Sequence, residues 1–270
     1  MKIAFIGGGN MAAALIGGLV KRGVAPADIY AVDINDEARE RTAKQFGIAT
    51  GAAIDEKLAA YDAILLAVKP QVLKSVAESL APHLSKQTII SIAAGIRATD
   101  LSRWLNGYTQ IVRTMPNTPA LIGMGVTGLA ALPGVSDDAK ALASQVLEAV
   151  GSSVWFDDEA KLDAVTAVSG SGPAYVFYFI EAMQEAARAL GLDEAQGREL
   201  AVATFTGAAQ LAAQSGEAAS VLRERVTSKG GTTAAALASF EAEGVKDAIV
   251  RGALAAQARA KEMGDELGGL

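Results

Sequence analysis

The stretch VTSKGGTT, Val226–Thr233, gathers residues able to bind a small anion within a half of the chain that otherwise favours alanine-rich helices. Gly230 and Gly231 allow a nest of backbone N–H groups that can hold a carboxylate. A helix starting near Thr233 would add the positive end of its dipole. The alternative is that Thr232 or Thr233 only N-caps the helix expected over 234–243. One helix start can serve both purposes.

A second chemical signal lies near the N-terminus, where Gly7, Gly9 and Ala12 match the pattern G-x-G-x-x-A. Gly7 would permit a tight turn, Gly9 would let the backbone approach a pyrophosphate, and Ala12 would allow close helix–strand packing. The following helix would point free N–H groups at the phosphates. Because a strand is expected before the motif and a helix after it, dinucleotide binding is favoured over an ordinary glycine turn.

Asp33 ends the second expected strand, at the place where an acidic residue binds the adenosine ribose hydroxyls of NAD. A carboxylate there would repel the additional phosphate of NADP, so Asp33 favours NADH over NADPH. Arg39 and Arg41 lie close in sequence and could offset this preference. The alternative for Asp33 is a helix N-cap.

Three further turns follow expected strands: Val68–Pro70, Ala93–Gly95 and Met115–Pro119. Ligands of open α/β sheets bind outside the carboxyl ends of the strands. Each turn alone could be purely structural, but together with the glycine loop they favour one dinucleotide crevice. The expected cofactor contacts are Ile6, Gly7, Gly8, Gly9, Asn10, Met11, Asp33, Ala67, Val68, Lys69, Pro70, Ala93, Ala94, Gly95 and Asn117.

Short β-rich runs alternate with helical stretches over residues 1–158, which predicts a Rossmann-type, doubly wound parallel sheet of the α/β class. Near-continuous apolar runs are typical of parallel strands covered on both faces. The expected strands are Lys2–Ile6, Ile29–Asp33, Ala63–Val68, Thr88–Ile92 and Gln110–Thr114, with two more near Val126–Ala131 and Ser152–Phe156.

Residues 159–270 have no β pattern and are expected to form an all-α domain. Asp193 and Gln196 predict a capping box for a helix that Gly216 ends. A last helix is expected over Val245–Met263. The segment Ser169–Pro173 marks either an approach to the nicotinamide or a tight helix crossing. A stripe at helical spacing is expected to be buried: Tyr175, Tyr178, Phe179, Met183, Ala187 and Leu190.

Composition narrows the function classes. The 270 residues are 51% hydrophobic and 20% charged, which suits a large core and a buried interface between copies of the chain. There is no cysteine and only one histidine, which excludes thiol catalysis and argues against a metal site. A net charge of −6 argues against nucleic acid. No apolar run suits a membrane helix and no signal peptide is evident, so a cytoplasmic protein is expected.

The motifs together resemble those of the pyrroline-5-carboxylate reductase family, along the whole chain. They are GGGNMA at 7–12, AVKPQ at 67–71, VRTMPNTP at 112–119, SGSGPAYVF at 169–177 and VTSKGGTTAAAL at 226–237. The resemblance implies an NAD(P)H-dependent reductase that reduces the C=N bond of 1-pyrroline-5-carboxylate to give proline. It also implies a Rossmann domain, a helical dimerisation domain, and a substrate bound between nicotinamide and helical domain.

By the same resemblance the Thr233 hydroxyl contacts the ring nitrogen and is the expected catalytic group. The expected substrate contacts are Val226, Ser228, Gly230, Gly231, Thr232 and Thr233. Two positions depart from the family pattern. Lys229 stands where proline is common, which loosens the turn, and Asp33 puts a preference for NADP in doubt.

The chemistry suits this chain, because a protonated cyclic imine is already activated for hydride transfer. Such an enzyme needs positioning, one hydrogen-bonding group at nitrogen and an anion site more than acid–base residues. A β-hydroxyacid dehydrogenase is the enzyme alternative, but it needs a lysine that Ala174–Leu190 lacks. A nucleotide-sensing protein without turnover would have no use for Val226–Thr233.

Overall fold

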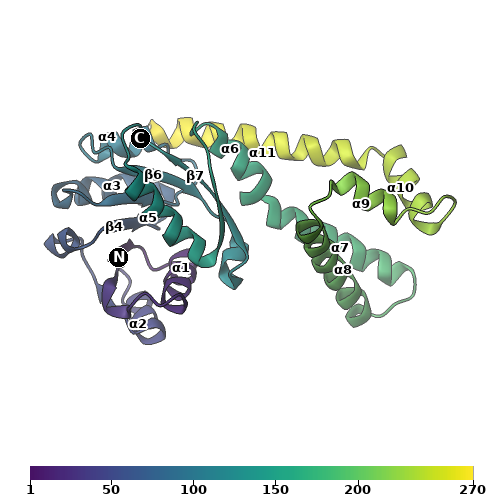
Figure 1. Cartoon of the computed structure of the whole chain (residues 1–270), viewed down its shortest axis with the longest axis horizontal. Coiled ribbons are helices and arrows are strands. Elements are labelled where there is room, and N and C mark those ends of the chain that lie inside the picture. Colours follow the sequence, from purple (N-terminus) through teal and green to yellow (C-terminus); the bar gives the residue numbers. More distant parts are fainter. Residues whose placement is uncertain (270) are drawn as a thin grey trace. The chain divides into compact units, whose positions relative to one another are not determined.

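The computed structural model describes residues 1–269, and this part of the chain forms two compact units (Figure 1). The sheet unit comprises residues 1–171 together with the chain from Ala256 onward, and the helical unit comprises Gly172–Ala255. This division differs from the expected domain boundary at 158/159. Residues 159–171 and the end of the last helix pack with the sheet, because their side chains bond to its loops.

The sheet unit is built on eight strands in the order β3-β2-β1-β4-β5-β6-β7-β8. All neighbours are parallel except β6 and β7, which run antiparallel, so the expected parallel sheet is confirmed apart from this one pair. The short edge strand β3 was not expected from the sequence. The strands are β1 Ile3–Ile6, β2 Ile29–Val32, β3 Ala49–Gly51, β4 Ala63–Leu66, β5 Thr88–Ser91, β6 Ile111–Met115, β7 Gly125–Ala131 and β8 Gly151–Trp155.

Helices cover both faces of this sheet. They are α1 Asn10–Lys21, α2 Asp36–Phe46, α3 Pro70–Leu80, α4 Ala98–Trp104 and α5 Asp137–Leu147. Short 3₁₀ helices connect them: η1 Pro26–Asp28, η2 Glu56–Ala60, η3 Ala81–His83, η4 Thr118–Ile122 and η5 Glu148–Val150. Successive strand residues face opposite sides, so Phe5 packs in the core under α1 and α5 while Ile6 packs in the core under α3 and α4. The strands are therefore apolar on both faces, as parallel strands require.

The strand order places the ligand crevice. The chain leaves β1 toward one edge of the sheet through β2 and β3, then returns to the other side of β1 with β4. Ligands of open α/β sheets bind where the strand order reverses, outside the carboxyl ends. This rule selects the residues after β1 and β4, which begin at Gly7 and Ala67.

The chain passes from the sheet unit into the helical unit through two consecutive helical segments. Helix α6, Lys161–Val165, continues into a π-helical turn, η6 Thr166–Gly170, and the chain enters the helical unit at Gly172. The hydroxyl groups of Thr166 and Ser169 each donate to the carbonyl four residues earlier, at 2.8 and 3.0 Å. Such bonds compete with regular helix geometry. The SGSGP segment thus distorts the helical path rather than ending it.

The helical unit consists of α7 Gly172–Ala189, α8 Glu194–Ser215, α9 Ala219–Arg225, α10 Thr232–Ala242 and the first half of α11 Val245–Gly268. The capping box at Asp193 and the left-handed Gly216 that ends α8 are both confirmed. The expected buried stripe on α7 is wrong: Tyr178 is 72% exposed and Leu190 82%. Of the stripe, only Ala187 is buried, where it packs at Gly197 of α8.

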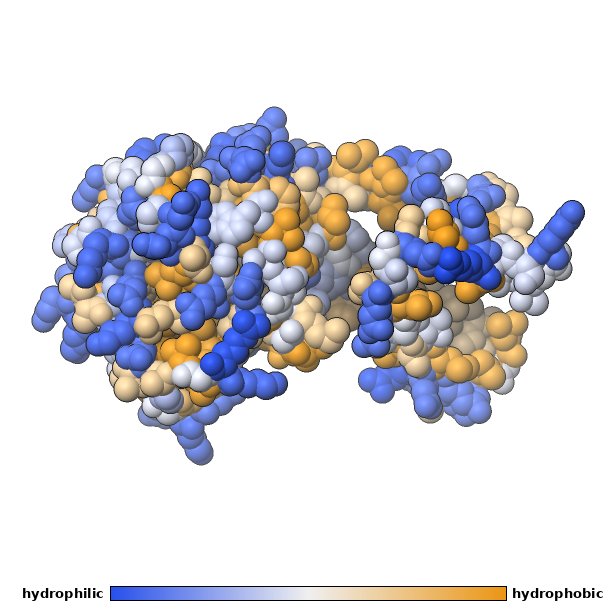
Figure 2. Space-filling model, viewed as in Figure 1, coloured by the Kyte–Doolittle hydropathy of each residue, from blue (hydrophilic) through white to orange (hydrophobic). Residues whose placement is uncertain are grey.

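The surface of the helical unit accordingly carries many exposed apolar residues among polar ones. Figure 2 shows orange, hydrophobic residues exposed over its helices. The stripe fails as a core prediction because helical spacing identifies an apolar face without telling which partner covers it. Among the described residues, no helix is long and apolar enough to cross a membrane.

Candidate functional site

The glycine loop after β1 has the geometry that its motif predicts. Gly7 has φ of 103°, and a Cβ there would lie 2.7 Å from the carbonyl oxygen of Ala67, so only glycine fits. Gly9 is the N-cap of α1, has no side-chain capping bond, and has open space where a Cβ would project. The N-terminus of α1 is therefore accessible to an anion. Ala12 is fully buried, as its packing role requires.

Asp33 is fixed at the carboxyl end of β2, beside this loop. Its Oδ2 accepts from the Gly8 amide at 2.6 Å and its Oδ1 from the Asn35 amide at 2.8 Å. The N-cap of α2 is Asn35, which accepts from the Ala38 amide, so Asp33 is not the helix cap. The carboxylate instead joins the second strand to the glycine loop, where a ribose would lie in a Rossmann site.

Two arginines from α2 also reach this end of the crevice. Arg39 Nη1 donates to the carbonyl of Asp33 at 2.7 Å, and its Nη2 pairs with the Asp36 carboxylate. Arg41 Nη2 lies 3.4 Å from the carbonyl of Gly8. Arg39 is thus paired with a carboxylate, whereas Arg41 contacts a backbone carbonyl oxygen. Side chains of both charge signs therefore lie around the carboxyl end of β2.

The turn after β4 lies against the glycine loop. The Ala67 amide donates to the Ile6 carbonyl at 2.8 Å, and its own carbonyl faces Gly7. Lys69 is the N-cap of α3 without a side-chain bond, and Pro70 occupies the first helical position, which suits a residue lacking N–H. The sequence-predicted contacts from Ile6 to Met11 and from Ala67 to Pro70 are therefore brought together.

The turn after β5 has a neighbour that the sequence did not predict. Gly95 has φ of 76°, and a Cβ there would lie 3.2 Å from both Met263 and Leu267 of α11. Packing against α11 is thus a sufficient reason for this glycine. The Arg97 guanidinium beside it pairs with Asp265, and this hydrogen bond raises the pKa of Arg97.

Asn117, expected as a cofactor contact, forms two hydrogen bonds within the protein. Its Nδ2 donates to the Ser169 carbonyl at 3.2 Å, and its Oδ1 accepts from the Val126 amide at 2.9 Å. The residue is buried. Both ends of the amide are therefore used to tie the loop after β6 to β7 and to the π-helical turn.

An ionic cluster around a buried arginine of the sheet unit was not expected from the sequence. Arg113, on β6, is only 5% exposed and pairs with Glu159 at 3.0 Å and Asp163 at 3.4 Å. The sequence feature that could have revealed this cluster is the charged residue within the otherwise largely apolar strand sequence IVRTM. Buried arginines need carboxylate partners, but the sequence could not identify which ones.

The stretch Val226–Thr233 forms a hydrogen-bonded turn between α9 and α10. The Gly231 amide donates to the Ser228 carbonyl at 3.0 Å, and Gly230 has φ of 72°. A glycine with positive φ in the third position is typical of a type II turn, whose second position, here Lys229, commonly carries proline. The family's proline and this chain's lysine therefore suit the same turn.

Helix α10 begins at Thr232, and its N-cap is Gly231, which has no side-chain capping bond. The alternative in which Thr232 or Thr233 only N-caps this helix is therefore not observed, because neither hydroxyl caps it. Thr233 is half-buried, while Ser228 and Thr232 are exposed. The turn offers an uncapped helix start flanked by hydroxyl groups, which suits a small carboxylate.

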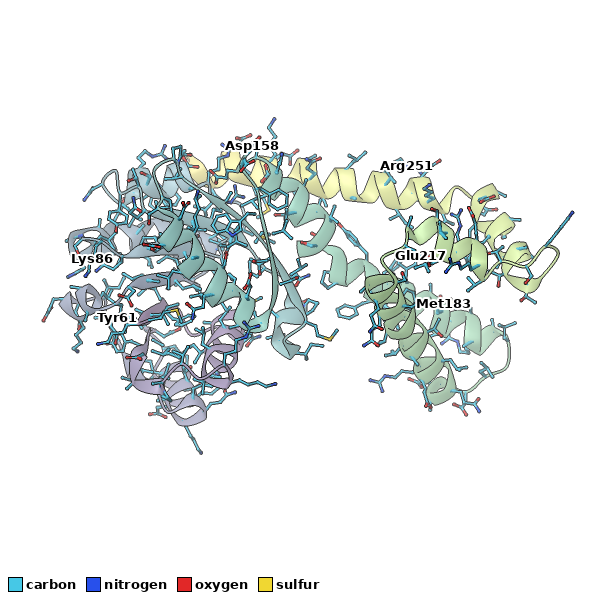
Figure 3. All side chains as sticks on the ribbon, viewed as in Figure 1. Tyr61, Lys86, Asp158, Met183, Glu217 and Arg251 are labelled. Carbon is cyan, nitrogen blue, oxygen red and sulfur yellow. The ribbon has the colours of Figure 1, made fainter. Side chains whose placement is uncertain are left out.

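The start of this turn is anchored from α9. The Arg225 guanidinium donates two bonds to the carboxylate of Glu217, labelled in Figure 3, which lies just after α8. The Thr227 hydroxyl donates to the Arg223 carbonyl.

Within the described residues, no group of three or more histidine, cysteine or acidic side chains could hold a metal ion.

Two family models match the chain. Residues 159–263 match pyrroline-5-carboxylate reductase dimerisation, and residues 2–95 match NADP oxidoreductase coenzyme F420-dependent. A pyrroline-5-carboxylate reductase of Pseudomonas aeruginosa is 47% identical, over 99% of this chain and 98% of that protein. One of Haemophilus influenzae is 45% identical, over 97% of each.

Solved structures agree with these relatives. A pyrroline-5-carboxylate reductase from Coxiella burnetii has a TM-score of 0.92 and 37% identity, covering 97% of this chain and 98% of that one. A pyrroline carboxylate reductase from Plasmodium falciparum, solved with NADP bound, has a TM-score of 0.86 and 29% identity, covering 98% of both chains.

Proposed function

The chain belongs to the pyrroline-5-carboxylate reductase family, and on this premise we propose which of its residues hold the cofactor and the substrate. The enzyme transfers hydride from NAD(P)H to the C=N bond of 1-pyrroline-5-carboxylate, giving L-proline in the last step of proline biosynthesis. The observation that carries the residue assignment is the pair of uncapped helix starts, α1 behind Gly9 and α10 behind Gly231.

The cofactor pyrophosphate binds at the N-terminus of α1. Gly7 and Gly9 leave room for it, and the amides at the start of α1 donate to its oxygens. The ribose hydroxyls bind Asp33, and the turns at Ala67–Pro70 and Ala93–Gly95 contact the rest of the dinucleotide. NAD(P)H supplies the hydride. The chain's own residues orient it.

The substrate carboxylate binds the turn before α10. The Gly230–Gly231 backbone and the α10 N-terminus neutralise its charge. The Thr233 hydroxyl accepts a hydrogen bond from the protonated ring nitrogen, or donates to the neutral imine, and thereby fixes the ring. Val226, Ser228 and Thr232 line the same turn. Hydride transfer then requires the C=N carbon to meet the nicotinamide, so the catalytic contribution is positioning and charge stabilisation.

Asp33 favours NADH, since a 2′-phosphate would meet its carboxylate. Arg41, which contacts the Gly8 carbonyl oxygen, is the residue that would accommodate NADPH. We expect a higher kcat/KM with NADH in steady-state assays with both cofactors. A clear advantage of NADPH would contradict this part of the proposal. The pyrroline carboxylate reductase from Plasmodium falciparum was solved with NADP bound, which supports keeping NADPH as the alternative.

The chain carries the family's dimerisation domain, and its helical region forms the homo-oligomer interface in this proposal. Residues 1–158 and 159–270 are the corresponding functional domains. The cytoplasmic location expected from the sequence belongs to the proposal as well.

The decisive assay is oxidation of NADH and NADPH, followed at 340 nm, on adding 1-pyrroline-5-carboxylate to purified protein. Turnover with at least one cofactor is expected, with proline as the product. Absence of turnover with both would refute the activity.

A further inference from the structure

We propose that Glu159 is a positioning residue for the nucleotide loop after β5, which it holds through a buried cluster with Arg113. This inference rests on the proposed role of Ala93–Gly95 as cofactor contacts. Glu159 itself touches neither cofactor nor substrate in this proposal. It acts through the first turn of α4, which directly follows that loop.

The key contact is a helix cap supplied from a distant part of the chain. Glu159 Oε1 accepts from the backbone amide of Ala98 at 2.7 Å. Ala98 is the first residue of α4, and the local N-cap, Arg97, forms no side-chain capping bond. A carboxylate at a helix N-terminus satisfies an open N–H and interacts favourably with the dipole. Glu159 therefore does for α4 what Asn35 does for α2.

The same carboxylate oxygen is held by Arg113. The Arg113 Nη1 atom lies 3.0 Å from Glu159 Oε1, and the Arg113 side chain is nearly buried. Asp163 accepts from the second guanidinium nitrogen at 3.4 Å. A buried guanidinium without carboxylate partners would be costly, so Glu159 and Asp163 offset the burial of Arg113. The cluster thus fixes the position of Glu159 relative to β6, and through it the start of α4.

The opposite side of the loop is held by α11. Gly95 packs against Met263 and Leu267, and Arg97 pairs with Asp265. A Cβ on Gly264 would lie 3.1 Å from the Arg97 guanidinium. Both braces come from segments beyond residue 158. Two of these residues, Glu159 and Met263, lie in the region that matches the family's dimerisation model, and the others follow it directly in the chain.

This arrangement predicts weaker cofactor binding when the bond between Glu159 and the Ala98 amide is lost. A loop that must be ordered on binding weakens the complex, because the lost freedom opposes association. For Glu159→Ala we expect a rise in the Kd of NADH and NADPH of about five-fold, the scale of a lost helix cap. Glu159→Gln keeps the accepting oxygen and should stay within about two-fold of the native Kd.

The experiment measures cofactor Kd by NAD(P)H fluorescence in the full-length protein, together with hydrogen exchange at residues 93–98. Asp163→Ala is the matched control, since it removes one partner of Arg113 and leaves the cap on Ala98. We expect Glu159→Ala to raise Kd and to speed exchange locally around Ala98. Asp163→Ala should lower Tm and leave Kd nearly unchanged.

The outcomes separate this inference from the proposed function. If the native protein binds neither cofactor, the proposed function fails. If the native protein binds cofactor and Glu159→Ala binds it equally well, the brace is refuted and the function stands. If exchange accelerates throughout the sheet unit, or if Asp163→Ala raises Kd as much as Glu159→Ala does, Glu159 is only a stability residue.

Discussion

The sheet unit and the helical unit bury their apolar residues in different ways. Every residue of β1, β2, β4 and β5 is buried, between helices on both faces. In the 84 residues of the helical unit, Gly172–Ala255, only Ala187, Gly197 and Ala201 are buried. The sheet unit buries its core within one chain, whereas the helical unit, most of which matches the family's dimerisation model, leaves many apolar side chains exposed.

The largest expected effect tests the self-sufficient core. Leu65 on β4 is fully buried, so Leu65→Ala should lower the free energy of unfolding by about 3 kcal/mol through lost burial and a cavity. The loss should be the same at low and high protein concentration, as measured by urea unfolding. A concentration-dependent loss would show that the sheet unit also depends on assembly.

A comparable effect, on turnover, should arise in the helical unit. Thr233→Val removes the proposed contact to the ring nitrogen while keeping the side-chain volume, and kcat should fall about 100-fold. Cofactor Kd should remain native, because the proposed cofactor contacts lie in the sheet unit. Thr232→Val is the control, with a smaller loss expected. Unchanged activity of Thr233→Val would remove Thr233 from the catalytic assignment.

A charge on the open face of the helical unit should weaken assembly. Leu200 on α8 is 57% exposed in one chain, and Leu200→Glu should weaken the oligomer at least about ten-fold if another chain covers it. Val72 on α3 is 48% exposed in the sheet unit, and Val72→Glu is the matched control. Size-exclusion chromatography with light scattering measures the mass of the assembly formed by each variant. If both variants assemble equally well, the exposed apolar residues of the helical unit matter no more for assembly than those of the sheet unit.

The smallest effect concerns the substrate turn. Lys229 precedes Gly230 in a turn whose second position suits proline, so Lys229→Pro should stabilise the protein by about 0.5 kcal/mol by restricting the unfolded chain. Thermal unfolding measures the shift. Destabilisation would mean that the backbone at Lys229 is unsuited to proline.

Much of the sheet unit was predictable, because local sequence and tertiary packing agree there. The glycine loop needs a positive φ at Gly7, and the apolar runs suit only strands covered on both faces. The capping box of α8 was equally local, since Asp193 and Gln196 lie within one turn. The α7 stripe was misjudged because its period marks an apolar face but not the molecule that covers it.

The sequence by itself determined the family motifs, the alternation of strands and helices, and the residue types at the glycine loop and the Val226–Thr233 turn. Each depends on φ, side-chain period or hydrogen bonds between near neighbours. Only the tertiary structure decided that Asp33 binds the Gly8 amide, that Asn117 is occupied by Ser169 and Val126, and that Glu159 caps α4. These contacts join residues up to 61 positions apart, and their geometry depends on how strands and helices pack.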